Sequence, residues 1–398
     1  MQHQPVPDDI ARELSRLTEG EVRLSPHDRG LYATDASLYQ VQPLGVVIPR
    51  YIAEVPNLVR FCHDHQLPIL PRGAGSSLAG QTVNRALVFD FSRYCNELLE
   101  ININNRTCRV QPGIVLDDLN NALAEQGTGL FFGPDVATSS HANLGGMIGN
   151  NSAGARSIIY GRTVENLNAL DVALADGRTM RFYEGAAADD PQVREITEQI
   201  AAVVLKYASE IKQRFPRTRR RVNGYNLDLI LTQLEKGGLN AVNLSHLCCG
   251  SEGTLALTLS AELKLSPLPV TRGLAVLGFA SLDEALAAVN PIINTHPSAV
   301  ELIDDMVMKT AKLNQSARPL LHIFDSLADR SDTDINSALY VEYYADSAEE
   351  LSQHFAALDR TVPDVPALYL HKAEEMADAW ALRKAAEPLL HALPGLRK

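Results

Sequence analysis

Cysteine is scarce in this sequence, with five residues among 398. The count is odd, no Cys-x-x-Cys pair occurs, and the spacing forms no regular framework; the five are Cys62, Cys95, Cys108, Cys248 and Cys249. Such a set is typical of reduced thiols in the cytoplasm rather than of a disulfide scaffold. It also argues against an iron–sulfur cluster or a structural zinc site within these residues. We expect the adjacent Cys248 and Cys249 to be buried small hydrophobic residues, with a strained disulfide as the alternative.

The sequence also lacks an excess of positive charge and lacks long apolar runs. Lys and Arg number 36 against 48 Asp and Glu, so the formal net charge is −12, which disfavours general binding to nucleic-acid backbones. No apolar stretch approaches the ~20 residues of a membrane span, and the N-terminus lacks the pattern of a secretory signal. With 45% hydrophobic and 21% charged residues, the chain is typical of a cytoplasmic globular protein of two or three domains.

Apolar periodicity predicts a mixture of strands and helices. Strands are expected at residues 45–48, 68–71, 86–91, 107–110, 254–265, 272–280 and 341–344. Helices are expected at residues 54–65, 116–125, 191–214, 281–290, 349–358 and 376–390. Asp176-Gly177, between strands at 167–174 and 179–182, is typical of a hairpin with a type I′ turn.

A glycine-rich loop spans residues 72–80, with glycine at positions 73, 75 and 80. The third glycine of a Rossmann fingerprint is replaced by Leu78, and no helix follows. A P-loop is excluded because no Gly-Lys-Ser/Thr occurs. Two interpretations remain: a tight turn, or a loop of main-chain N–H groups that wraps an anion, where glycine permits close approach.

A second segment rich in Gly, Ser and Asn runs from Gly133 to Gly161, and a third small cluster begins at Gly250. The second segment carries Met147 and Ile148 among its small residues, which is uncommon in disordered linkers. A long ordered loop inside a domain is usually functional. Two such loops about 60 residues apart in an α/β context favour an extended dinucleotide over a single phosphate.

Three segments carry a resemblance to a known family: PRGAGSSLAG, GPDVATSSHANLGGMIGNNSAGARSIIYGRT and CGSEGTLALTLSAELKL. In order and spacing they resemble the FAD-linked D-2-hydroxy-acid dehydrogenases, which include D-lactate dehydrogenases, the glycolate oxidase flavin subunit and D-2-hydroxyglutarate dehydrogenase. The resemblance implies an α+β fold. A helical lead-in at 1–40 would precede an FAD-binding domain of the vanillyl-alcohol-oxidase or PCMH type, with two α+β subdomains, at 41–268. An incomplete α+β substrate, or cap, domain of the FAD-linked oxidase C-terminal type would follow at 269–398.

The resemblance also implies which residues bind the cofactor. The first loop would wrap the FAD pyrophosphate through Arg72, Gly73, Ala74, Gly75, Ser76 and Ser77, closed by Gln81 and Thr82. The second segment would line the path from diphosphate to flavin through Pro134, Asn143, Gly145, Gly146, Asn150, Asn151, Gly154, Tyr160 and Gly161. The adenine or ribose end would contact Glu252, Gly253 and Leu255. Some relatives attach flavin covalently through a histidine in the first loop, where this chain has Ser76 and Ser77, so we expect non-covalent FAD.

For the substrate, the resemblance points to Arg383 in the segment WALRK, with Tyr225 as a second contact. An arginine binds a carboxylate through a bidentate fork, although a solvated surface arginine is the alternative. The family's general base and metal-binding histidines belong to Gly-His and Glu-His-Gly segments, which are absent up to Lys398. The catalytic base is therefore unassigned, and we expect it beyond Lys398. The chain would then be an N-terminal portion of a longer protein, or an FAD module that another subunit completes.

The expected function is FAD-dependent oxidation of a D-2-hydroxy acid (D-lactate, glycolate or D-2-hydroxyglutarate class) with hydride transfer to flavin N5. Electrons would pass to a non-NAD acceptor such as a quinone, a cytochrome or an Fe–S domain. Fe–S or a divalent metal is expected only from a missing C-terminal region. The alternatives are an FAD-binding fragment or subunit without complete catalytic machinery, and an enzyme like alkyl-glycerone-phosphate synthase. Six basic residues lie between Lys212 and Arg221. Three interpretations are open: a solvated face, steering of an anionic substrate, or contact with acidic lipid at the inner face of a membrane.

Overall fold

The computed structural model describes residues 6–218, 220–330 and 334–391, which separate into two compact units. Unit 1 comprises the chain up to Gly154 together with residues 160–267, and unit 2 comprises residues 155–159 together with the chain from Leu268 onward. The second glycine-rich segment therefore leaves unit 1 for five residues and then returns to it. Within the described residues, no helix is both long and apolar enough to cross a membrane.

The first sheet of unit 1 has four strands in the order β1-β2-β4-β3: Glu21–Arg23, Gly45–Ile48, Leu87–Asp90 and Ile69–Arg72. Strands β2, β4 and β3 are parallel, and β1 is antiparallel to β2. The helices of this region are α1 (Asp8–Leu14), α2 (Pro26–Leu31) and α3 (Val55–Asp64). Helix α3 buries Val55, Leu58, Val59 and Cys62, the helical spacing that predicted it.

The second sheet of unit 1 is antiparallel, with five strands in the order β5-β6-β10-β8-β9. The strands are Leu98–Asn102, Thr107–Val110, Leu257–Lys264, Leu167–Ala173 and Thr179–Tyr183. A short pair, β7 (Leu130–Phe131) and β11 (Ser266–Pro267), lies outside it. The accompanying helices are α4 (Leu116–Glu125), α5 (Leu144–Asn150), α7 (Ala186–Asp189), α8 (Pro191–Lys206), α9 (Ala208–Arg214), α10 (Leu227–Gly237) and α11 (Ser245–Cys248).

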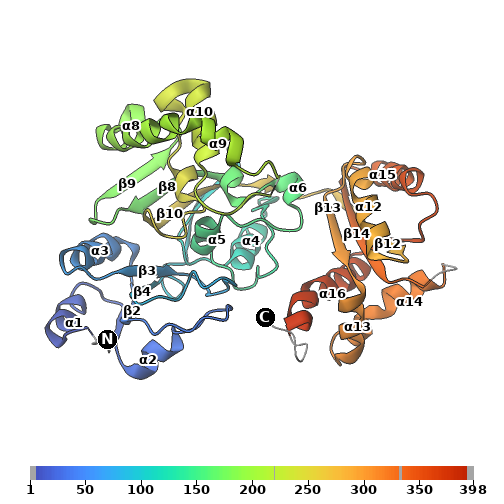
Figure 1. The fold of residues 1–398 in the computed structure, drawn as a ribbon, viewed down its shortest axis with the longest axis horizontal. Helices are drawn as coiled ribbons and strands as arrows, with labels where there is room; N and C mark the ends of the chain where they lie inside the picture. The colour runs from blue at the N-terminus through green and yellow to red at the C-terminus, as the bar shows by residue number, and fades with distance from the viewer. Residues whose placement is uncertain (1–5, 219, 331–333, 392–398) are drawn as a thin grey trace. The chain divides into compact units, whose positions relative to one another are not determined.

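Unit 2 is built on an antiparallel sheet in the order β13-β14-β12-β15: Ala299–Ile303, Ser337–Ala345, Thr271–Phe279 and Ala367–Leu370. One apolar cluster includes buried residues of α12 (Leu282–Ile293) and α15 (Ala348–Thr361). A second cluster includes buried residues of α13 (Asp305–Leu313), α14 (His322–Ala328) and α16 (Ala373–His391). The sheet is thus covered on both faces (Figure 1). Short α6 (Ser157–Tyr160) begins in the five-residue segment of this unit.

Three local predictions were wrong in detail. The second glycine-rich segment is not a loop throughout, because it contains α5, which buries Leu144, Met147 and Ile148. The helix predicted at 191–214 is two helices, interrupted at Tyr207. The β8–β9 hairpin forms as predicted, but only Gly177 has positive φ, and Leu174 N–H donates to the Arg178 carbonyl. That geometry is a three-residue loop with a glycine bulge rather than a type I′ turn.

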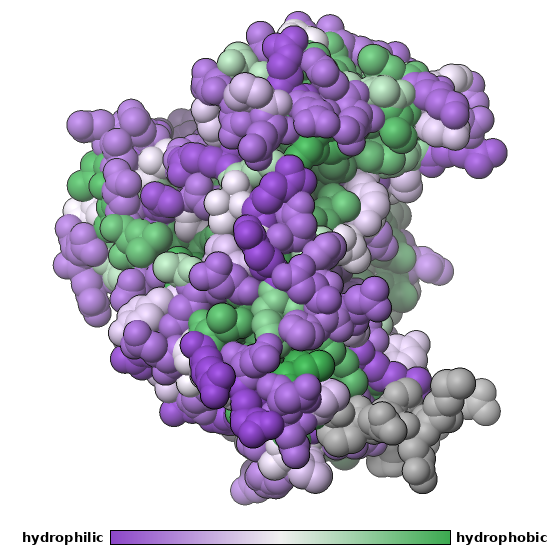
Figure 2. Space-filling view, turned by 90° about the vertical axis from the view of Figure 1, so that its left-hand side faces the viewer, coloured by the Kyte–Doolittle hydropathy of each residue, from purple (hydrophilic) through white to green (hydrophobic). Residues whose placement is uncertain are grey.

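The surface carries both hydrophilic and hydrophobic residues. Figure 2 shows a face on which hydrophilic residues predominate and hydrophobic residues form separate patches. Scattered exposed apolar residues are normal for a globular domain. The five cysteines are buried and none forms a disulfide, so Cys248 and Cys249 are the small hydrophobic residues that the sequence indicated.

Candidate functional site

The first glycine-rich loop lies against the other two clusters. A Cβ added to Gly73 would stand 3.0 Å from Asn143 Oδ1, at the start of α5. A Cβ added to Gly253 would stand 2.5 Å from Pro71 Cγ, at the end of β3. Neither position has room for a side chain without displacement of its neighbour. The fold therefore brings two glycines close to side chains about 70 and 180 positions away in the sequence.

The second and third clusters are joined by main-chain hydrogen bonds. Gly250 N–H donates to the Ile148 carbonyl over 2.9 Å, and Glu252 N–H donates to the Gly149 carbonyl over 3.0 Å. Gly250 and Gly253 have φ of 87° and 74°, and Glu252 has φ of 55°. The third cluster therefore makes a tight left-handed turn that docks on the end of α5.

The first loop presents unsatisfied main-chain donors. Within the part of the chain that the structure describes, the N–H groups of residues 74–77 have no hydrogen-bond partner. Gly75 has φ of 68° and its carbonyl accepts from Ala36 N–H over 3.0 Å. Consecutive free N–H groups in a turn form a concave anion-binding nest. The geometry supports an anion-wrapping loop over a mere tight turn.

Arg72, expected to face the bound anion, is directed at the protein itself. Its Nη1 donates to the carbonyls of Tyr32 and Thr82 at 3.3 and 3.0 Å, and its Nη2 donates to the carbonyl of Thr34 at 2.8 Å. Thr82 Oγ1 donates to Asp35 Oδ2 over 2.9 Å. Both Arg72 and Thr82 are therefore engaged with residues 32–35, which sequence reasoning did not assign to the site.

The side chains that close the loop make contacts of their own. The hydroxyl of Ser77 bonds the side-chain oxygen of Gln81. Desolvation raises the pKa of the Glu252 carboxyl, and a hydrogen bond with Gln81 opposes that rise. Gln81 therefore links the first loop to the third cluster. Leu255, two residues beyond Gly253, is exposed.

Two asparagines of the second segment carry buried atoms without partners among the described residues, namely Asn143 Oδ1 and Asn151 Nδ2. Asn143 Nδ2 donates to the Gly113 carbonyl over 2.5 Å, which fixes the orientation of that amide. An unpaired buried polar atom costs ~1–3 kcal/mol, so it calls for an explanation such as a ligand. Beside Asn143, Gly146 has open space where a side chain would point, whereas Asn150 Nδ2 donates to Ser152 Oγ over 2.9 Å.

Other predicted residues of the second segment have packing roles. Pro134 is buried. A Cβ on Gly145 would meet Pro112, and one on Gly154 would meet the Asp135 carbonyl. The ring of Tyr160 packs against Gly133 and Phe131, and Gly161 has φ of 69°. These residues shape the segment by close approach.

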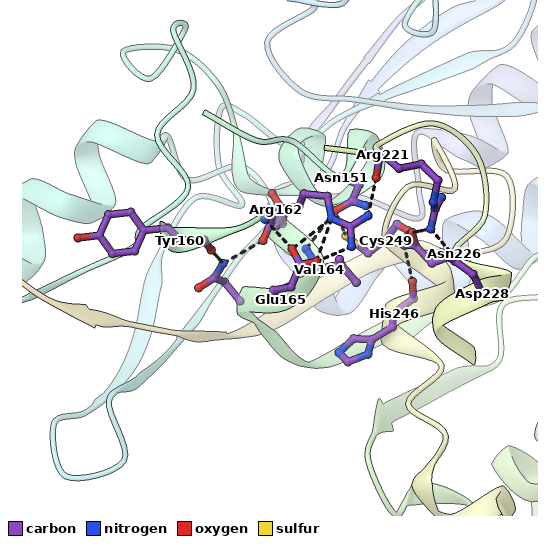
Figure 3. A network of polar contacts seen from close by, with 12 residues as sticks. Asn151, Tyr160, Arg162, Val164, Glu165, Arg221, Asn226, Asp228, His246 and Cys249 are labelled. Atoms are coloured by element: carbon purple, nitrogen blue, oxygen red, sulfur yellow. Dashed lines mark hydrogen bonds and ion pairs between the residues drawn. The ribbon is translucent and has the colours of Figure 1, made fainter. Parts of the chain in front are cut away.

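A polar network beneath the turn holds the second and third clusters together (Figure 3). Asn151 Oδ1 accepts from Val164 N–H over 3.1 Å and from Cys249 Sγ over 3.5 Å. Asn226 is fully buried, and its Nδ2 donates to the carbonyls of His246 and Cys249 at 3.0 and 2.8 Å. Arg221 donates to Asn226 Oδ1 and pairs with Asp228. The network fixes the backbone at Gly250.

The basic run at 212–221 is not one uniform face. Lys212 and Arg214 form surface pairs with Glu235 and Glu210, but Arg221 is 8% exposed and belongs to the network. The solvated-face interpretation is therefore wrong for Arg221. Nearby, Tyr225 is 40% exposed and its hydroxyl bonds Thr254 Oγ1 over 2.8 Å, so it lies beside the third cluster.

Arg383 lies in unit 2, on α16, where Glu301 of β13 holds it. Arg383 Nε and Nη2 contact Glu301 Oε2 at 2.7 and 2.6 Å. A second pair in this unit was missed in the sequence: Arg156 Nε and Nη2 donate to the two oxygens of Glu342 at 2.6 and 2.8 Å. Glu342 is fully buried. Only its place as the one charged residue of β14, among mostly apolar and aromatic residues, could have drawn attention to it.

The catalytic base has no residue assigned to it in this chain. The family resemblance implies a base beyond Lys398, and the described residues end at His391. Across the described ranges, no group of three or more His, Cys, Asp and Glu side chains is placed to hold a metal ion. The location of the base beyond Lys398 therefore stays a prediction.

Comparison with known proteins identifies two families in the chain. Residues 43–183 match the FAD binding domain family, and residues 268–396 match the C-terminal domain of FAD linked oxidases. The chain is 30% identical over 393 residues to a D-2-hydroxyglutarate dehydrogenase of Pseudomonas putida, covering 94% of this chain and 38% of that protein. It is 27% identical over 375 residues to the glycolate oxidase subunit GlcD of Bacillus subtilis, covering 93% of this chain and 66% of that subunit.

A solved structure agrees on the fold. An alkyldihydroxyacetonephosphate synthase aligns with 98% of this chain and 66% of its own, at a TM-score of 0.71 and 18% identity. This likeness concerns the fold alone. The chain spans between 33% and 38% of the length of the D-2-hydroxyglutarate dehydrogenases that it matches.

The residues present fit FAD. The free N–H groups of residues 74–77 provide donors for a pyrophosphate. The unpaired Asn143 Oδ1 and Asn151 Nδ2 provide one acceptor and one donor for the polar groups of a cofactor. Glycine at positions 73, 250 and 253 permits the close approach of the three clusters.

Proposed function

Because the chain belongs to the FAD-linked oxidases, whose FAD binding domain and C-terminal domain it carries in that order, we propose that it acts in the oxidation of a D-2-hydroxy acid to the 2-oxo acid. The relatives named D-2-hydroxyglutarate dehydrogenase and glycolate oxidase subunit support this substrate class. The acid is a small molecule, and the electron acceptor is of a kind other than NAD, such as a quinone, a cytochrome or an Fe–S domain.

One observation carries the cofactor part of the proposal. Three glycine-rich clusters meet at close range, and the first presents four consecutive N–H groups without protein partners among the described residues, at 74–77. Such a nest suits a pyrophosphate. The first loop has Ser76 and Ser77 where a covalent histidine would be needed, so the cofactor is held without a covalent bond. FAD, when bound, supplies the acceptor for the hydride of the α-carbon.

The protein's own residues then have distinct tasks. Gly73, Gly75 and their neighbours bind the pyrophosphate, while Asn143 and Asn151 satisfy polar groups further along the cofactor. Arg383 binds the substrate carboxylate. Its Nη1 makes no contact with Glu301, so one donor of the fork is available to a second carboxylate. Tyr225 offers a hydroxyl that already bonds Thr254.

The test is a flavin assay on the purified protein. We expect a yellow protein that releases FAD on acid precipitation, and whose flavin absorbance bleaches anaerobically with one of D-lactate, glycolate or D-2-hydroxyglutarate. The L-enantiomers of the chiral acids serve as the control.

Two outcomes separate the alternatives. Bound FAD that none of these acids reduces would support an FAD-binding subunit without complete catalytic machinery. Flavin retained in the acid pellet would contradict non-covalent binding.

A further inference from the structure

The residues just before the matched FAD domain hold the first glycine-rich loop of the candidate site. That domain begins at residue 43, yet the carbonyls of Tyr32 and Thr34 both accept hydrogen bonds from Arg72, at 3.3 and 2.8 Å. Arg72 is the last residue of β3 and directly precedes the first loop. The segment at 32–36 is therefore attached to the base of that loop.

The attachment is made at several points. Thr82, after the loop, accepts from Arg72 Nη1 through its carbonyl over 3.0 Å and donates through Oγ1 to Asp35 Oδ2 over 2.9 Å. At the tip, Gly75 accepts from Ala36 N–H over 3.0 Å. The loop is thus fixed at its beginning, its tip and its end by one segment.

Arg72 lies at the centre of these contacts. A Cβ on Gly75 would stand 2.5 Å from Arg72 Nη2, so the loop curls around the guanidinium. The guanidinium also lies over the ring of Tyr32, with Cζ 5.4 Å from the centroid. Tyr32 is held in turn by a 2.7 Å hydrogen bond from its hydroxyl to Asp90. A planar guanidinium with five donors can serve three carbonyls at once, which the compact ammonium of lysine cannot reproduce.

We propose that Arg72 is a positioning residue for FAD: it clamps residues 32–36 to the first loop and so shapes the nest of free N–H groups, rather than pairing with the pyrophosphate. The proposal rests on the proposed FAD binding. It assigns Asp35 and Thr82 to the same clamp. The loop's own N–H groups, not the arginine charge, hold the anion.

The two possible roles of these residues predict opposite results. If Arg72 contacted the phosphate, Arg72→Met would lose an ion pair with the cofactor and make the salt slope shallower, and removal of the nearby Asp35 charge would strengthen binding of an anion. If Arg72 is a clamp, the salt slope is unchanged in Arg72→Met, and Asp35→Ala weakens binding although it makes the protein less negative.

The experiment measures the Kd of FAD for the apoprotein by flavin fluorescence at several salt concentrations. We expect Arg72→Lys and Arg72→Met to weaken binding at least tenfold, and Asp35→Ala and Thr82→Val at least threefold. The slope of log Kd against log salt should be the same in Arg72→Met as in the wild type, because no ion pair with the cofactor is lost. Arg109→Lys, at a sheet arginine paired with Asp171, and Asp64→Asn, on exposed α3 surface, should bind FAD like the wild type.

Each outcome has a clear meaning. Full affinity in Arg72→Lys, tighter binding in Asp35→Ala, or a shallower salt slope in Arg72→Met would overturn the clamp while leaving FAD binding intact. A wild-type protein that binds no FAD would overturn the proposed function together with the clamp. Thr82→Val keeps the side-chain volume and the main-chain carbonyl and removes only the bond to Asp35, so it tests that part of the clamp if the Arg72 variants fail to fold.

Discussion

The buried ion pair between Arg156 and Glu342 makes a quantitative prediction about unit 2. The Glu342 side chain is 1% exposed and that of Arg156 is 18% exposed. Two bonds join them, at 2.6 and 2.8 Å, and Ser298 Oγ donates to Glu342 over 3.3 Å. Removal of one partner of a buried pair costs about 3–5 kcal/mol, because it leaves an uncompensated charge. We therefore expect Glu342→Gln to lower the free energy of unfolding of unit 2 by about 3 kcal/mol, at the low end of that range.

A second contribution comes from the aromatic rings around Arg156. Its Cζ lies 5.0 Å from the centroid of Trp380 and 5.8 Å from that of Tyr344. Cation–π contacts of this kind contribute about 0.5–2 kcal/mol. They keep Arg156 in place when Glu342 is neutralised, so its charge stays mostly buried after it loses the Glu342 carboxylate. The double variant Arg156→Met/Glu342→Gln removes that charge and should be more stable than Glu342→Gln alone.

The assay must report on unit 2, since a chain of two units need not unfold in one step. Hydrogen exchange followed on peptides from β14 and α16 provides this, and a loss of about 3 kcal/mol corresponds to a fall in protection of about two decades. Glu349→Gln, at an exposed position of α15, is the control and should change the stability by less than ~0.5 kcal/mol. Wild-type protection in Glu342→Gln, or a double variant no more stable than Glu342→Gln, would refute the reasoning.

Three other perturbations have defined outcomes. Gly75→Val should lose FAD, because φ at Gly75 is 68° and the new side chain would meet Arg72. Gly30→Ala, where the new side chain would meet open space, should retain FAD. Visible flavin absorbance after gel filtration distinguishes the two variants. Burial lowers the pKa of His246 below its ordinary value of 6.5, so its contribution to stability is complete above 6.5 and is lost as the pH falls through the folded-state value. His246→Gln should flatten the fall in melting temperature as the pH is lowered below 6.5, and an unchanged slope would count against this. Arg383→Ala should keep its FAD but lose at least tenfold in the rate constant of flavin reduction by the 2-hydroxy acid, because a charge-assisted bond contributes about 1.5–3 kcal/mol. Arg383→Lys should not restore the rate. Unchanged kinetics in either variant would exclude Arg383 from substrate binding.

The fold elements that could be predicted are those with a strong apolar period. Helix α4 begins and ends at the residues expected, 116 and 125, because Leu116, Leu119 and Leu123 mark one face. Helix α5 could not be found in this way, since three of its seven residues are glycine and each glycine costs a helix about 1 kcal/mol. Tertiary packing overrides that cost: Leu144, Met147 and Ile148 are buried, and Gly145 permits contact with Pro112.

The candidate site could be predicted from the sequence in part for a similar reason. Glycine and asparagine clusters indicate where the backbone approaches a ligand, so the three loops stand out in the sequence. The partners of Arg72 do not, because they are carbonyl groups of Tyr32, Thr34 and Thr82, and a carbonyl leaves no signature in the residue type. Arg156 is hidden likewise, since its partner Glu342 is 186 residues away.

The arginines around the loops bind other protein groups, so an acidic chain must hold an anionic cofactor by other means. Arg72 donates to carbonyls, Arg162 to Glu165, and Arg221 to Asn226 and Asp228. Each of these guanidinium groups is thus used to fix protein backbone or another side chain. On the proposed function, attraction of the pyrophosphate falls to the N–H dipoles of residues 74–77, which bear no net charge. Dipoles at close range are screened less by salt than separated charges on a surface. The affinity for FAD should therefore depend weakly on ionic strength, and the net charge of −12 does not oppose it, because the contacts that matter are short and local.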